Sequence, residues 1–215
     1  MSDELLGTLI GGIIGVLGTV LGTFITQINT RKIKESEMKQ KEYLAKRETL
    51  TEIYKSLITI INLYPNESPN DILSWIECAP NYSLESYNSI FTSLDFILED
   101  YEKQLCNPVI DQRRKSDLQT QISNITYAKG KLKLNRDSYF KAKKENLAFV
   151  ETDKTIFDLY ASQHVRNCLV EFDVVINNVF TSGQSVGEPD NPNNNTIKIV
   201  KRKIIHSMRS DIGIS

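Results

Sequence analysis

The N-terminal part of the chain is dominated by a long run without charged side chains. It extends over Leu5–Ile28, follows Asp3 and Glu4, and is itself followed by several lysines and arginines. About 20 apolar residues are enough for a helix to cross the hydrocarbon core of a bilayer. The pattern therefore predicts one transmembrane helix within residues 1–30. The rest of the chain is too polar to span, and the acidic start does not fit a signal peptide.

The basic residues that follow this run predict its orientation. Lysine and arginine concentrate on the cytoplasmic side of membrane spans. Here Arg31, Lys32 and Lys34 all follow the run. We therefore expect the residues before Leu5 outside the membrane and residues 31–215 in the cytoplasm.

Small side chains collect on one side of the predicted membrane helix. At about 100° per residue, the glycines and threonines fall in one arc, and the bulky aliphatic residues fall in the opposite arc. Glycines spaced four apart allow helix backbones to approach closely. The arc predicts the packing face of a homo-oligomer, which either lines a pore or only holds an anchor together. This Gly/Thr face comprises Gly7, Thr8, Gly11, Gly12, Gly15, Gly18, Thr19, Gly22, Thr23 and Thr26.

Helical periodicity continues through the remainder, where glycine and proline are scarce. Residues 31–63 predict a stalk helix that is highly charged at first and then enters a bundle. Its apolar seam at Tyr43, Leu50 and Leu57 predicts either a bundle face or a short coiled coil. Residues 64–181 predict a cytoplasmic helical bundle. The expected fold class is all-α, with an N-terminal transmembrane helix that a long stalk helix extends into the bundle.

Turn residues divide the predicted bundle into helices. Ser68 and Pro69 fit the N-cap and the first position of a short helix. Longer apolar stripes predict helices over 83–105, from about 109 to 150, and over 154–181. Gly130 is a potential kink in the second of these.

The C-terminal segment differs from the bundle in composition. Residues 182–195 are rich in glycine, proline and asparagine, which predicts a flexible linker. Residues 196–215 form a basic amphipathic tail. Such a helix lies on anionic lipid or on a partner protein, or it packs as an ordinary element of the fold.

Charge is segregated along the chain, although its sum is only −1. Residues 56–102 contain acids and no lysine or arginine, whereas residues 109–150 are mainly basic. The two stretches either pair with each other, or the basic one binds a phosphate-bearing ligand such as a nucleotide or oligonucleotide. Contact with anionic inner-leaflet lipid is the third possibility, and it fits the C-terminal tail better. The candidates for anion binding are Arg113, Arg114, Lys115, Lys129, Lys131, Lys133, Arg136, Lys141, Lys143 and Lys144.

Catalytic signatures are missing from the sequence. The two histidines, His164 and His206, are far apart, and the three cysteines form no CxxC motif. No phosphate-binding loop or nucleophile motif occurs. We therefore expect no enzyme, no cofactor and no metal site.

The first 60 residues have a recognisable arrangement. A glycine-rich span, GTLIGGIIGVLGTVLGTFITQ, runs directly into a charged helix, RKIKESEMKQKEYLAKRETLTEIYKSL. This resembles small single-pass transmembrane effectors of bacterial anti-phage defence. The resemblance implies a bacterial inner-membrane protein whose spans oligomerise to perturb the membrane. It also implies a cytoplasmic domain that senses a nucleotide signal or a regulatory protein.

Two functional hypotheses follow. In the first, the chain is a membrane effector that forms a regulated pore, such as an ion channel, or a membrane-disrupting assembly, gated by its helical domain. In the second, it is a non-conducting membrane-anchored scaffold that docks a cytoplasmic protein partner. Both place the chain in contact with inner-membrane lipid, but only the first requires a homo-oligomer.

Overall fold

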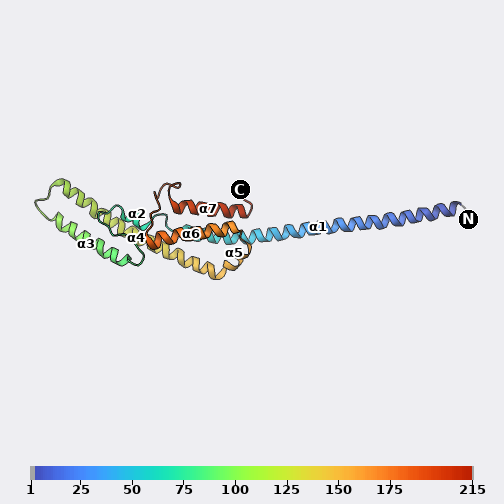
Figure 1. Cartoon of the computed structure of the whole chain (residues 1–215), viewed down its shortest axis with the longest axis horizontal. Coiled ribbons are helices and arrows are strands. Elements are labelled where there is room, and N and C mark those ends of the chain that lie inside the picture. Colours follow the sequence, from blue (N-terminus) through green and yellow to red (C-terminus); the bar gives the residue numbers. More distant parts are fainter. Residues whose placement is uncertain (1–2, 215) are drawn as a thin grey trace. The chain divides into compact units, whose positions relative to one another are not determined.

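The structure, a computed structural model, describes the backbone of residues 3–214 and the side chains of Thr19 and residues 22–214. All regular structure in this range is helical, so the expected all-α class is confirmed for the described residues. The helices are α1 (Asp3–Leu63), α2 (Pro69–Leu73), α3 (Tyr87–Leu105), α4 (Gln112–Thr152), α5 (Lys154–Tyr160), α6 (Gln163–Ser182) and α7 (Thr196–Asp211) (Figure 1).

The chain divides into two compact units within α1. Unit 1 comprises residues 1–49, and unit 2 comprises residues 50–215. The expected seam begins later than the sequence suggested: Leu50 and Leu57 are buried, but Tyr43 is 54% exposed. Packing within unit 2 therefore starts at Leu50, and Tyr43 belongs to neither of its core clusters.

The predicted membrane segment Leu5–Ile28 falls mostly on residues whose side chains are not described. Its backbone is helical from Asp3 onward. Among the described residues, no helix combines the length and the apolar character that a membrane crossing requires.

Unit 2 has a core made of two hydrophobic clusters. The larger cluster joins the C-terminal part of α1 to the C-terminal half of α4 and to α5, α6 and α7. In it the Tyr64 and Phe172 rings lie 5.4 Å apart, and Tyr139 stacks on Phe180 at 5.0 Å. The smaller cluster joins α2, α3 and the preceding part of α4 around the fully buried Leu94. These contacts make unit 2 a helical bundle.

The predicted helix over residues 154–181 is in fact two helices, α5 and α6. Ala161 and Ser162 between them are extended, with ψ angles of 142° and 155°. The Ser162 hydroxyl accepts a hydrogen bond from the Val165 amide, and the Ser162 amide donates to the Asp211 carboxylate at 3.0 Å. N-cap bonds of this kind favour a new helix start. Apolar periodicity alone does not reveal the break.

The start of α2 and the end of α6 meet in unit 2. Ser68 caps α2 and Pro69 is its first residue, so that prediction is confirmed. At the end of α6, Gly183 adopts a left-handed conformation with φ of 71°. Its carbonyl oxygen accepts hydrogen bonds from the Ser68 hydroxyl at 3.2 Å and from the Asn70 amide at 2.7 Å. A side chain at Gly183 would collide with Asn70, so this approach requires glycine.

Residues 183–195, whose composition predicts a flexible linker, are tied to the bundle by hydrogen bonds. Val186 is buried, and its amide donates to the Asp71 carboxylate at 3.0 Å. Its carbonyl oxygen accepts from the Thr196 amide at 2.9 Å. Asn195 caps α7 and is fully buried. These bonds position α7 against the rest of unit 2.

The basic tail is packed in this structure. α7 lies beside α6 (Figure 1). It also contributes Lys201, whose ammonium group is buried and donates to the Tyr64 carbonyl oxygen at 2.6 Å and to the Asn66 side-chain oxygen at 2.8 Å. The apolar side of α7 thus belongs to the core, through Ile197, Val200, Ile204 and Met208.

Candidate functional site

Small polar side chains form a shallow groove along one side of α1 in unit 1. The hydroxyl of Thr23 donates to the Thr19 carbonyl oxygen at 2.7 Å, and that of Thr26 donates to the Gly22 carbonyl oxygen at 2.8 Å. These bonds satisfy the hydroxyls within the helix. The groove is lined by Thr19, Gly22, Thr23, Thr26, Gln27, Thr30, Arg31 and Lys34. The other members of the Gly/Thr face, Gly7, Thr8, Gly11, Gly12, Gly15 and Gly18, lie outside the residues with described side chains.

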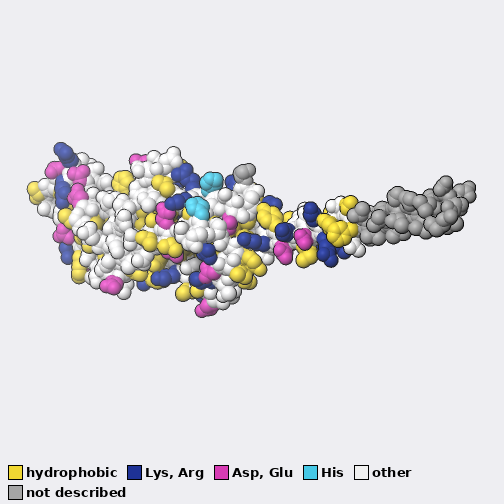
Figure 2. Space-filling view, turned by 45° about the vertical axis from the view of Figure 1, so that its right-hand side comes forward, with side chains coloured by type: hydrophobic (Ala, Val, Ile, Leu, Met, Phe, Trp, Pro, Cys, Tyr) yellow, Lys and Arg dark blue, Asp and Glu magenta, His cyan; other side chains and the backbone are white. Residues whose placement is uncertain are grey.

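Large apolar side chains on the same helix are exposed. Phe24 is 61% exposed, Ile25 57% and Ile33 58%. In Figure 2 hydrophobic and charged side chains both lie on the surface of the described part of unit 1. A lone helix in water is only marginally stable, and a series of exposed apolar side chains marks a surface that is covered in use. The exposed apolar side chains make the described part of α1 in unit 1 a candidate contact surface.

The ten basic candidate residues all lie on α4, but they do not converge on one site. At about 1.5 Å per residue, Arg113 and Lys144 stand roughly 45 Å apart along the helix. Arg113, Arg114 and Lys115 are exposed at its N-terminal end, and Arg114 donates to the Gln104 side-chain oxygen at 3.0 Å. The other seven lie further along the helix.

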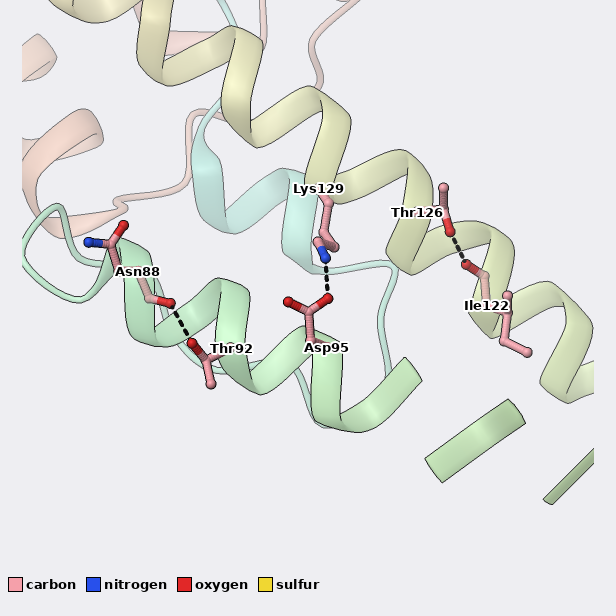
Figure 3. A network of polar contacts seen from close by, with 6 residues as sticks. All are labelled: Asn88, Thr92, Asp95, Ile122, Thr126 and Lys129. Atoms are coloured by element: carbon pink, nitrogen blue, oxygen red, sulfur yellow. Dashed lines mark hydrogen bonds and ion pairs between the residues drawn. The ribbon is translucent and has the colours of Figure 1, made fainter. Parts of the chain in front are cut away.

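Two of these seven residues pair with the acidic stretch. Lys129 forms an ion pair with Asp95 of α3, and Figure 3 shows the two side chains pointing toward each other between the helices. Lys131 lies 4.0 Å from the Glu67 carboxylate. Side-chain hydroxyls nearby, such as that of Thr126, bond within their own helix. Lys129 therefore links α4 to α3, and Lys131 lies beside an acidic residue just before α2.

Arg136 is engaged with aromatic rings. Its guanidinium lies 4.2 Å from the ring centre of Tyr87 in α3 and 5.3 Å from that of Phe140 in α4. The positive charge is attracted to the faces of both rings. Arg136 thus fastens α3 to α4.

In the C-terminal half of α4, three exposed lysines that form no ion pair among the described residues share one side of the helix: Lys133, Lys141 and Lys144. Spacings of eight and eleven residues place them within about 80° on one side of the helix. Phe140, 43% exposed, lies on the same side. We call Lys133, Lys141 and Lys144 the α4 basic face. Lysines beside an exposed aromatic ring suit phosphate and base binding, respectively. Lys143 is also exposed, with its ammonium 5.7 Å from the Tyr139 ring centre.

The structure reveals a groove that sequence reasoning missed. It has a volume of about 680 Å³ and includes the exposed rings of Trp75 and Tyr127. Four carboxylates and one lysine line it, so the groove repels anions. No local sequence motif predicts this groove, because its charged residues come from separate segments of the chain. The acids are Glu67, Asp71, Glu188 and Asp190, and the lysine is Lys131.

The described residues offer no metal centre and no disulfide. Among the described residues, no group of three or more histidine, cysteine or acidic side chains could hold a metal ion. Cys78 and Cys106 are exposed, Cys168 is buried, and all three are free thiols.

Comparisons with protein-family models, with curated proteins and with solved structures give no match.

Proposed function

We propose that the chain is an effector of a bacterial inner membrane that assembles through the Gly/Thr face of α1. The assembly forms a pore or a membrane-disrupting cluster, and unit 2 in the cytoplasm regulates it. The observation that carries this proposal is the exposure of α1 on both of its sides. Phe24 and Ile25 offer an apolar surface suited to lipid, whereas Gly22 and the bonded threonines offer a small surface suited to a second helix.

The α4 basic face is the proposed place for a regulatory nucleotide or oligonucleotide. It combines three lysines without ion pairs and one exposed ring on one side of a helix. The acidic groove that includes the rings of Trp75 and Tyr127, here called the Trp75 groove, is unsuitable for such a ligand because its carboxylates repel phosphate.

Native mass spectrometry of the full chain in mild detergent tests the assembly. We expect a closed oligomer, with extra mass if a nucleotide is retained. Gly22→Leu should dissociate it, since a Cβ and its branches at Gly22 project into open space where a neighbouring helix would pack. The matched control is Phe24→Trp, which adds bulk on the opposite side of α1 and should leave the oligomer intact.

A membrane-anchored scaffold for a protein partner is the second candidate. The Trp75 groove favours it, because acids and exposed rings together suit a basic protein segment. A wild-type chain that is monomeric in detergent and releases no dye from liposomes would support the scaffold and contradict the effector.

A further inference from the structure

An apolar cavity of about 290 Å³ lies in unit 2 among α1, α4, α5 and α6. Its wall contains several buried side chains, among them Leu57 of α1, Phe149 of α4, Phe157 of α5 and Phe172 of α6. None of the ten basic candidates from the sequence lines it. At about 30 Å³ for a water-sized group, the cavity accommodates roughly ten non-hydrogen atoms. It therefore has the size of a small organic molecule.

Four charged side chains border this cavity, and three of them are already engaged. Lys154 forms an ion pair with Asp158. Arg166 donates to the Asp158 backbone carbonyl at 2.7 Å and to the Gln163 side chain at 3.1 Å. Lys154 thus has a carboxylate partner, whereas Arg166 has neutral acceptors for its two terminal nitrogens and none for its buried Nε.

Asp173 is the exception. It lines the cavity and forms no hydrogen bond or ion pair in the described part of the chain. The Asp173 side chain is exposed to solvent, and partial burial by neighbouring groups raises the pKa of its carboxyl. Its charge is close enough to Tyr64 to raise the pKa of that phenol, after the larger effect of burial. Asp173 is therefore the acidic side chain at this cavity that has no partner in the described part of the chain.

Aromatic side chains in the wall of the cavity also favour a positively charged ligand. Tyr64, Phe149, Phe157 and Phe172 all contribute to the wall. Aromatic faces attract a cation as well as apolar groups. An unpartnered carboxylate beside such a wall suits a ligand with an apolar body and a positively charged end.

We propose that this cavity binds a small hydrophobic amine, with its apolar body against Leu57, Phe157 and Phe172 and its ammonium group on Asp173. Such a ligand touches α1, α4, α5 and α6 at once. It therefore stabilises the folded form of unit 2 against unfolding. This site is separate from the α4 basic face and does not depend on the proposed membrane function.

Thermal unfolding and calorimetric titration of the full chain in mild detergent test the proposal with 2-phenylethylamine as the probe. The matched ligands are 2-phenylethanol, which lacks the charge, and 3-phenylpropionate, which reverses it. We expect the amine to raise the melting temperature and to bind about tenfold more tightly than either matched ligand, as a charge-assisted hydrogen bond provides. Equal binding of the alcohol, stronger binding of the carboxylate, or no binding of the amine would each overturn the proposal.

Two variants of α6 assign the effect to the carboxylate. Asp173→Asn removes the proposed partner and should weaken amine binding about tenfold while the circular dichroism spectrum stays unchanged. Glu171→Gln removes the same charge from an exposed site that pairs with Lys203, outside the cavity, and should bind the amine as the wild type does. Unchanged binding in Asp173→Asn would show that the ammonium group does not sit on this residue.

Discussion

Lys201 of α7 links the C-terminal helix of unit 2 to the segment that follows α1, at Tyr64 and Asn66. Burial and, to a smaller extent, the nearby charge of Lys198 together lower the pKa of its ammonium group to about 8. Its two oxygen acceptors, on Tyr64 and Asn66, are neutral. The charged lysine is therefore less stable in the folded chain than in the unfolded chain, where its pKa is near 10.5.

This shift predicts how the stability of unit 2 depends on pH. Between about pH 8 and 10.5 the folded state releases the Lys201 proton before the unfolded state does, so the free energy of unfolding rises with pH by about 2–3 kcal/mol. Tyr64 and Tyr82 act in the opposite direction above pH 10, because burial raises the pKa of each phenol to about 12. Stability should therefore peak near pH 10 in urea titrations.

Lys201→Met should remove the rise between pH 8 and 10 and keep the decline above pH 10. The methionine side chain preserves most of the buried volume but carries no proton. A variant with the wild-type pH profile would assign the titration to another group.

At the level of elements, α7 is part of the core although its sequence is basic. Ile204 is fully buried, whereas Ile199 on the same helix is 41% exposed. Ile204→Ala should lower the free energy of unfolding of unit 2 by about 2–5 kcal/mol, because it leaves a cavity. Ile199→Ala is the matched control and should cost about 1 kcal/mol or less. Chemical denaturation measures both.

Equal effects of the two substitutions would contradict this placement of α7. They would mean that α7 leaves unit 2 in solution and is free to lie on lipid or on a partner. The measurement therefore also decides between the two roles that its amphipathic sequence allows.

At the level of the whole molecule, we expect unit 2 to fold in buffer by itself, whereas unit 1 should need detergent or a second copy of the chain. Both core clusters consist of residues from Leu50 onward. A chain that starts at Lys46, one turn earlier, should fold cooperatively and stay monomeric in buffer without detergent. The full chain should require detergent or oligomerise. Sedimentation and thermal melting of the two chains check this, and a truncated chain that fails to unfold cooperatively would contradict it.

Local signals account for the parts of the fold that the sequence predicted. Ser68 and Pro69 start a helix through their own backbone preferences, so the start of α2 could be placed in advance. The break at Ser162 could not, because the apolar period on its two sides is continuous and the bond to Asp211 comes from a residue far along the chain. Tyr43 fits a heptad with Leu50, yet only the fold shows where packing begins.

The candidate sites also divide into features that the sequence predicts and features that only the tertiary structure shows. By itself the sequence determined the all-α class and the basic character of α4, and it predicts the Gly/Thr face, because these depend on residue type and on the helical period. Only the tertiary structure decided that Lys129 and Lys131 are paired while Lys133, Lys141 and Lys144 are not. It alone assembled the cavity beside Asp173 from four helices. Pairing and enclosure depend on distances between residues remote in sequence, and those distances are set by packing.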